Sequence, residues 1–318
     1  MKHITFQEFV TKIAGTIKSY LPEDYTAATV HIQKNVKPGD KVLTGISICR
    51  PNCNIAPILY LDDIYPRYCA GERFETLLQR LARSIVEETK YVTDLQQYLK
   101  WDVAKDFVTS RLINHDRNAG YIANRPFIPV NESPIGVVFD IDLSGLTEQN
   151  MSIPITFSLM EHWGTTIADL DKASKANNPR LRPVFIRAMG QVLSDSFPGM
   201  EIPEIPDLFL IVTNENLSHG AITVTYAGVE EQLKQLLGEF YLIPSSIHEM
   251  LAVSRNMASP DALTGMVQEI NDTQVAAEDV LDSTLYTLEN GQLIPVQLEE
   301  QPFNKNTVPS SFIPVSAN

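Results

Sequence analysis

The sequence predicts an α+β protein, with an N-terminal helix, a three-stranded meander and two helices, then a mixed α/β half that ends in a hairpin. Three observations support this fold class. Apolar residues recur at helical spacing near the N-terminus and again after Gly71. β-branched runs separated by turn residues lie between these two segments, and Asn290-Gly291 stands between two strand-like runs near the C-terminus.

The first predicted element is an amphipathic helix over residues 6–21. Thr5 and Glu8 have the spacing of a capping box, and Pro22 follows the end of the pattern. The apolar residues at helical spacing are Phe6, Phe9, Val10, Ile13, Ile17, Tyr20 and Leu21. They should form one buried face.

Three strands are expected next, over residues 30–32, 42–48 and 55–61. Lys37-Pro38-Gly39-Asp40 separates the first two, and Arg50-Pro51-Asn52 the second from the third. The helical period then returns over residues 74–86 and 95–104, which predicts two helices covering one face of the meander.

The second half alternates between strand and helix patterns, which leaves open a mixed sheet as well as an antiparallel one. A hairpin of residues 208–212 and 221–226 is predicted across the polar turn 214–220. The other expected strands are 135–143, 153–157 and 249–253, and the other expected helices begin at Thr165 or Thr166 and at residues 184, 229 and 262. Asn177-Asn178-Pro179 is expected to close the first of these helices.

Residues 114–132 are rich in Asn, Arg and Pro, and we place a domain boundary there. The expected division is an N-terminal α+β domain over 1–115 and a C-terminal α+β domain over 116–301. Residues 302–318 contain isolated apolar positions among Asn, Ser, Thr and Pro, which predicts a flexible tail or a strand-adding arm.

Composition excludes several classes of protein. Of the 318 residues, 44% are hydrophobic, so the chain is long and apolar enough to fold around a core. Lys and Arg number 25 against 39 for Asp and Glu, and the net charge of -14 argues against direct nucleic-acid binding. No apolar stretch approaches the roughly 20 residues that span a bilayer, so no membrane segment is expected.

Cysteine usage and the N-terminus favour a cytoplasmic protein. Cys49, Cys53 and Cys69 are odd in number and lack a matching His or Cys pair, so reduced thiols are expected and no cofactor is predicted. Charged residues interrupt the first 20 positions, which is unlike a secretory signal peptide.

Several phrases together resemble the uncharacterised domain-of-unknown-function family number 5688. In the first half they are Lys34-Asn35, Leu43-Thr44-Gly45-Ile46, Ile55 to Asp62 and Tyr68-Cys69-Ala70-Gly71. In the second half they are Leu112-Ile113-Asn114, Leu210 to Asn214 with Gly220-Ala221, Leu242 to Glu249, Met266 to Asn271 and Thr273-Gln274-Val275. The resemblance covers about residues 3–298. It implies a bacterial, gut-associated cytosolic protein and, because the family has no assigned activity, transfers no catalytic residue.

One segment suggests nucleophilic chemistry. Ser246, His248 and Glu249 lie close together after Pro244, and they are the weak catalytic candidates. Ser246 and His248 are two residues apart, whereas a nucleophile and its base normally come from separate segments. The simpler interpretation is that Ser245 and Ser246 cap a turn while His248 bonds a backbone carbonyl.

A second segment suggests cation binding. Asp140 and Asp142 alternate along a strand, so both carboxylates face one side and could hold Mg²⁺ or Ca²⁺. A third ligand would be needed, and Asp62-Asp63 is the only other adjacent acidic pair at the end of a predicted strand. The solvated face of an edge strand is the simpler interpretation. His115-Asp116-Arg117-Asn118 superficially resembles a kinase catalytic loop, but no glycine-rich phosphate loop accompanies it.

These observations favour a non-catalytic interaction or accessory protein with an unidentified protein partner. The alternative is a hydrolase or metal-dependent enzyme that combines Ser246, His248 and Glu249 with Asp140 and Asp142. A third hypothesis, an acidic DNA mimic or mobile-element accessory protein, requires a continuous stripe of carboxylates. The sequence leaves the oligomeric state open.

Overall fold

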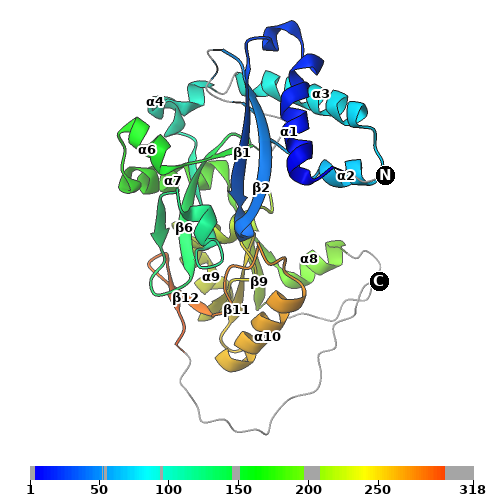
Figure 1. Cartoon of the computed structure of the whole chain (residues 1–318). Helices are drawn as coiled ribbons and strands as arrows, with labels where there is room; N and C mark the ends of the chain where they lie inside the picture. The colour runs from blue at the N-terminus through cyan, green and yellow to red at the C-terminus, as the bar shows by residue number, and fades with distance from the viewer. Residues whose placement is uncertain are drawn as a thin grey trace.

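The computed structural model describes residues 4–51, 53, 56–93, 96–144, 151–196 and 208–297. These residues form an α+β structure with three antiparallel sheets, which confirms the predicted fold class (Figure 1). None of the helices in this part of the chain is both long enough and apolar enough to cross a bilayer. The expected tail over 302–318 lies outside the described residues.

The first sheet is the predicted meander. Its order is β1-β2-β3, with β1 at Thr29–Lys37, β2 at Lys41–Cys49 and β3 at Leu59–Tyr60. α1 (Phe6–Thr16) begins with the expected Thr5–Glu8 capping box, and α3 spans Phe74–Thr93. Phe9 and Ile13 of α1 share one core with Ile46 of β2 and Leu78 of α3. The smaller elements are η1 (Ile17–Tyr20), η2 (Glu23–Tyr25), η3 (Pro38–Asp40) and α2 (Tyr65–Cys69).

The helix expected over residues 95–104 does not cover this sheet. It is broken into η4 (Gln96–Leu99) and α4 (Trp101–Ala104), which pack in the core of the next sheet. Ala104 is buried there with Val108 and Phe139. The prediction was wrong because helical periodicity shows that a face is buried without showing which neighbour buries it.

The second sheet has the order β4-β6-β5, with β7 also paired to β6. Its strands are β4 (Val108–Asn114), β5 (Phe127–Pro129), β6 (Ile135–Asp142) and β7 (Ser152–Pro154). The sequence analysis missed β4, whose seven residues are all buried and therefore lack an alternating pattern. The helices in this part of the chain are α5 (Ala119–Ile122), α6 (Phe157–Trp163) and α7 (Ile167–Leu181).

Helix α7 protects the free edge of β4. Thr166 caps its start as expected, but the helix continues past Asn177-Asn178-Pro179 to Leu181. The Asn178 side chain accepts from Ser110 N at 3.0 Å, and the Asn177 side chain donates to Val108 O at 2.9 Å. These amides satisfy edge groups that another chain could otherwise pair with.

The third sheet has the order β13-β12-β10-β11-β9-β8. The strands are β8 (Val184–Ala188), β9 (Phe209–Asn214), β10 (Phe240–Ile243), β11 (Met250–Ser254), β12 (Tyr286–Glu289) and β13 (Gln292–Pro295). The helices are α8 (Met189–Ser196), η5 (Gly220–Thr225), α9 (Val229–Leu237) and α10 (Pro260–Thr273). Asn290 and Gly291 both have positive φ, so the C-terminal hairpin is confirmed.

Two predictions in this sheet were wrong. The helix expected at residue 184 begins only at Met189, because Val184–Ala188 pair with β9 as a strand. Residues 221–226, expected to be a strand, form η5 instead. β9 has β8 on one side and β11 on the other, so it has no free edge for a hairpin partner. A short apolar run that is buried on all sides gives no period that separates strand from helix.

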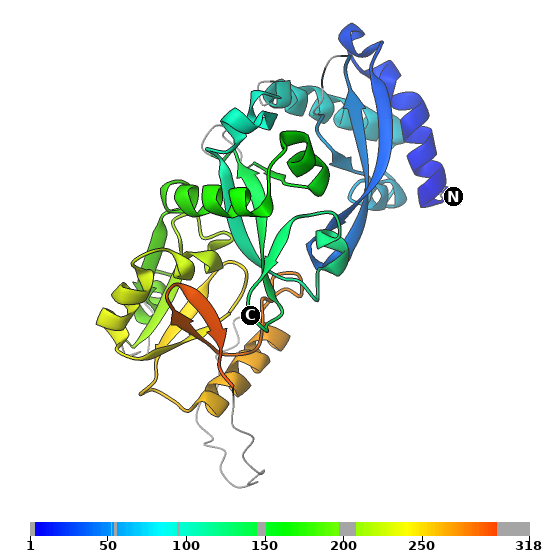
Figure 2. The same ribbon diagram turned by 90° about the vertical axis from the view of Figure 1, so that its left-hand side faces the viewer.

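The tip of the β1–β2 hairpin contacts the second sheet's loops (Figure 2). Asp40 accepts from the backbone amides of Gly120 and Tyr121 at 3.0 and 2.8 Å, and Gly39 N donates to Asn118 at 2.7 Å. Asn114 reaches in the other direction and donates to Leu281 O at 2.8 Å. Residues 114–121, which include the segment that resembled a kinase loop, therefore contact both the first sheet and the segment before β12. The boundary at residue 115 stays a prediction, although β4 and β6 pair across it.

Gly220 provides a stability test of the third sheet. A Cβ there would meet Thr213 Oγ1 and would lie 2.6 Å from Asn214 N and 2.7 Å from His248 O. We expect Gly220→Ala to lower the free energy of unfolding by about 2–3 kcal/mol in urea titrations. Gly15→Ala, on the exposed side of α1 with open space around it, should instead stabilise by about 0.5–1 kcal/mol. Equal effects of the two substitutions would contradict the packing described.

Candidate functional site

Asp140 and Asp142 lie on a buried face of the second sheet. β6 is flanked by β4 and β5, and register places Thr109 opposite Asp140 and Arg111 opposite Val138. Alternation along the strands therefore puts Arg111 on the same face as both aspartates. Asp140 is 3% exposed and Asp142 is 6% exposed. The interpretation as a solvated edge-strand face was wrong because β6 is an interior strand.

Asp140 is shared by two arginines. Arg111 Nε lies 2.9 Å from Asp140 Oδ2, and Arg125 Nη2 lies 2.5 Å from Asp140 Oδ1. Both guanidinium groups also donate to the hydroxyl of Tyr121. Burial alone would raise the pKa of Asp140, but the two positive charges outweigh it and hold that pKa well below the ordinary value. The carboxylate is therefore ionised.

Asp142 has its own arginine. Arg182, just after α7, places Nε 2.6 Å from Asp142 Oδ2, while Asp142 Oδ1 accepts from Ser144 N at 3.0 Å. We call Arg111, Arg125, Arg182, Asp140 and Asp142 the arginine cluster. Its carboxylates bind guanidinium groups, and no group of three or more metal-ligating side chains occurs in the described part of the chain. Asp62, the other acidic candidate, accepts from Thr44 N in the first sheet.

A strained loop carries His219 to this cluster. Leu217 and His219 both have positive φ, and Asn214 bonds the loop back on itself through Ser218. Burial, together with the charges of Arg111 and Arg182, lowers the pKa of His219 to about 3. The imidazole is therefore neutral at physiological pH.

The catalytic candidates Ser246, His248 and Glu249 do not form a reactive pair, and each has a different environment in the structure. Ser246 Oγ accepts from the backbone N–H of His248 at 3.0 Å, which is a turn bond. His248 Nδ1 accepts from His219 N at 3.2 Å, and its Nε2 lies 3.5 Å from Asp279 Oδ1. Burial raises the pKa of Glu249. His248 is thus brought beside His219 and Asp279, and its ring bonds a backbone N–H rather than the expected carbonyl.

The ion pairs of the arginine cluster and the position of His219 beside it were not predicted from the sequence. The available signal was Arg111 just before the apolar pair Leu112-Ile113, since a charge in a buried strand requires a partner. The two aspartates were identified, but the partners lie up to 40 residues away along the chain.

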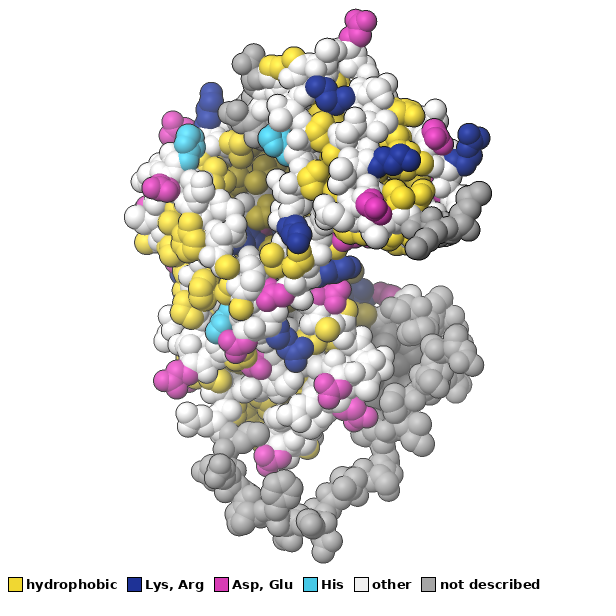
Figure 3. Space-filling model, viewed as in Figure 1, with side chains coloured by type: hydrophobic (Ala, Val, Ile, Leu, Met, Phe, Trp, Pro, Cys, Tyr) yellow, Lys and Arg dark blue, Asp and Glu magenta, His cyan; other side chains and the backbone are white. Residues whose placement is uncertain are grey.

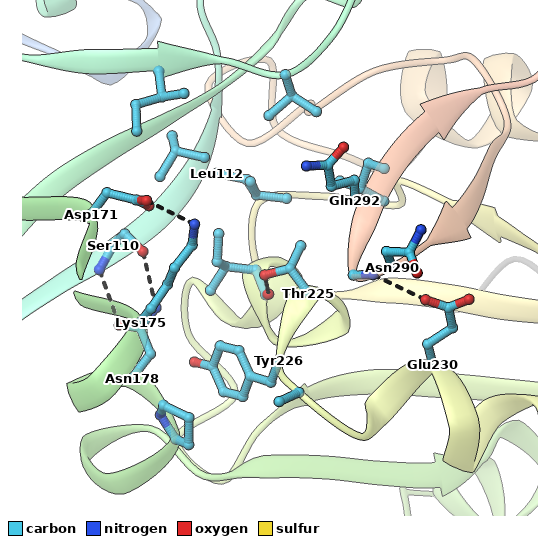
Figure 4. Close-up of a pocket in the computed structure, with 18 of the residues that line it drawn as sticks. Ser110, Leu112, Asp171, Lys175, Asn178, Thr225, Tyr226, Glu230, Asn290 and Gln292 are labelled. Atoms are coloured by element: carbon cyan, nitrogen blue, oxygen red, sulfur yellow. Dashed lines mark hydrogen bonds and ion pairs between the residues drawn. The ribbon is translucent and has the colours of Figure 1, made fainter. Parts of the chain in front are cut away.

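A groove of about 610 Å³ lies between the second and third sheets (Figure 4). Its apolar wall includes Leu112, Val137, Ile222 and Leu293. One rim is formed by α7, where Lys175 and Asp171 pair at 2.7 Å. The opposite rim is formed by the β12–β13 turn, where Glu230 accepts from Gly291 N at 3.0 Å. The volume is in the range of sites that bind small molecules or short peptide segments.

A family model described as a family of unknown function, DUF5688, matches residues 6–289. The chain belongs to the DUF5688 family. No curated protein and no solved structure matches it. The function of this DUF5688 protein is therefore inferred from its own arginine cluster and groove.

Removing the shared carboxylate tests the cluster. Asp140→Asn leaves Arg111 and Arg125 buried without their counter-charge, so we expect the free energy of unfolding to fall by about 3–5 kcal/mol in urea titrations. Asp24→Asn, at an exposed pair with Arg50, is the matched control and should cost less than about 1 kcal/mol. A loss at Asp140 no larger than at Asp24 would show that the cluster is not stabilising.

His219 predicts a specific pH dependence. Its pKa is about 3 in the folded protein against 6.5 for the free side chain, so the unfolded chain binds more protons between these values. Stability should therefore fall as pH drops below about 6.5. Asn tolerates the positive φ of this position, so His219→Asn should reduce the loss between pH 7 and pH 5 by about 1–2 kcal/mol. His31→Asn, on exposed β1, is the control, and an unchanged pH profile in His219→Asn would refute the assignment.

Proposed function

We propose that this DUF5688 protein is a non-catalytic interaction protein that binds a short extended segment of a partner protein in the groove. The observation that carries the proposal is the groove itself, with an apolar wall between two polar rims. Such a wall can bury aliphatic side chains, while the rims can bond the backbone between them.

The rim chemistry supports a peptide ligand. Asn290 and Gln292 are exposed side-chain amides, each of which can donate and accept, as a peptide backbone does. They stand opposite α7, with the apolar wall between (Figure 4). Asn131, also on the groove, donates to Leu293 O and so ties the two sheets together at the wall.

Charge supports a partner segment that is neutral or basic. The charged residues lining the groove are Asp171, Glu230, Glu231 and Lys175. Lys175 pairs with Asp171 and Glu230 pairs with Lys234, which leaves the exposed Glu231 as the excess charge at the rim. The chain's net charge of -14 adds a long-range attraction for basic partners.

The hydrolase or metal-dependent alternative has less support. Ser246 bonds a backbone amide rather than the imidazole, and Asp140 and Asp142 bind arginines. On the face seen in Figure 3, carboxylates are scattered among basic side chains, whereas a DNA mimic needs a continuous stripe. The free thiols Cys49, Cys53 and Cys69 support a cytoplasmic location, and the bacterial source remains an expectation from the resemblance.

Filling the groove tests the proposal. Thr225 lines its centre, so Thr225→Trp should obstruct it with little loss of core packing. We expect display libraries of random short peptides to yield aliphatic sequences that bind the wild type and bind Thr225→Trp at least about tenfold more weakly, by fluorescence anisotropy.

Thr11→Trp is the matched control. Thr11 is exposed on α1 and, like Thr225, donates to a carbonyl of the preceding turn. The Thr11→Trp variant should bind the selected peptides as tightly as the wild type does. Failure to select any peptide, or equal binding by Thr225→Trp and the wild type, would overturn the proposed function.

A further inference from the structure

The arginine cluster holds more positive than negative charge. Arg111, Arg125 and Arg182 are 5%, 2% and 9% exposed, and among the described residues their ion-pair partners are Asp140 and Asp142. The histidine beside them is neutral, because its pKa lies far below physiological pH. Burying a net charge costs free energy unless a counter-charge is present. The net charge of the arginine cluster is positive, although that of the whole chain is -14.

The same arginines have unused hydrogen-bond donors. Arg111 Nη1, Arg125 Nε and Arg182 Nη1 are buried and have no partner among the described residues, and neither does the hydroxyl of Tyr226. Each such group forfeits its hydration without a replacement bond. The aspartates accept from other nitrogens of these arginines, and Asp142 also from Ser144, but they make no bond to the three free nitrogens.

Two of the arginines with free nitrogens are bound side by side. Arg111 pairs with Asp140 and Arg182 pairs with Asp142, and these aspartates are two residues apart on one face of β6. Arg111 and Arg182 both lie close enough to His219 for their charges to act on its imidazole. Arg182 acts in the same way on the hydroxyl of Tyr226. η5, which follows His219 in the chain, contacts β4, so His219 and the hydroxyl of Tyr226 lie on the side of the sheet where the two arginines are bound.

We propose that a small inorganic anion binds between Arg111 and Arg182, next to His219 and the hydroxyl of Tyr226. With one singly charged anion bound, the three positive charges of the arginines would be balanced by the two aspartates and the anion. It would also accept from the free Nη1 donors, and charge-assisted bonds of this kind are the stronger ones. This site lies beside the peptide groove, and binding of the anion does not require a peptide in the groove.

The anion reaches this site from the groove. The free nitrogens are out of contact with solvent, so a side chain must move to admit the ion. Tyr226 lines the groove (Figure 4), and its buried hydroxyl lies close enough to Arg182 for the charge of Arg182 to act on it. Tyr226 is therefore the side chain that moves.

The test measures thermal unfolding of the whole chain against added bromide and, separately, added phosphate. Ionic strength is held constant with a bulky organic salt, so that screening does not change. We expect a saturable rise in melting temperature of several degrees with at least one of the two anions, and the anion that saturates identifies a halide or an oxyanion site.

Arg182→Lys is the main variant because it keeps a cation beside Asp142 but loses the planar fork of donors. Its apparent anion affinity should fall at least about tenfold. Arg80→Lys, at an exposed pair with Glu72, is the control and should respond as the wild type does. Tyr226→Phe removes an unpaired buried hydroxyl, so it should melt higher than the wild type without anion and gain less when anion is added.

Crystals soaked in bromide locate the ion by anomalous scattering. A peak in contact with Arg111 and Arg182 supports the proposal. Melting temperatures that do not saturate with either anion, or an Arg182→Lys response equal to that of the wild type, overturn it.

Discussion

The ion pairs that Asp140 makes with Arg111 and Arg125 are the constraint on which the centre of the structure depends. One carboxylate on an interior strand accepts from a neighbouring strand and from the segment after α5, so it fixes β4, β6 and that segment together. Tyr121 is held by the same guanidinium groups, and its backbone N–H bonds Asp40 of the first sheet. A single buried charge thus links elements that are far apart in the chain.

The two candidate sites follow from how the third sheet meets this centre. β4 is an edge strand, and α7 covers its edge through Asn177 and Asn178. The groove remains where the β12–β13 turn stands opposite α7. The loop before η5 brings His219 to the arginines, and Gly220 allows it because no Cβ fits between Thr213 and His248. The groove and the arginine cluster are therefore adjacent. Tyr226 lines the groove and lies close enough to Arg182 for that charge to act on its hydroxyl.

The candidate site was only partly predictable from sequence. Asp140 and Asp142 were identified as a pair on one face, since alternation along a strand depends on neighbouring residues alone. Their arginine partners were not identified, because each comes from another element. Ser246 and His248 were identified as neighbours, yet the groups that contact the His248 ring are His219 and Asp279. Proximity in sequence suggested a reactive pair, and the fold gave these side chains different partners.

Local chemistry determined the α+β class, the Thr5 capping box, the first hairpin and the Asn290-Gly291 turn, because each depends on a few consecutive residues. Tertiary structure decided that residues 184–188 are a strand, that 220–225 are a 3₁₀ helix and that 108–114 are the buried edge of a sheet. It also decided which charges meet. Fully buried segments carry no amphipathic period, and ion pairs between distant residues leave no trace in the order of the sequence, so both require the assembled fold.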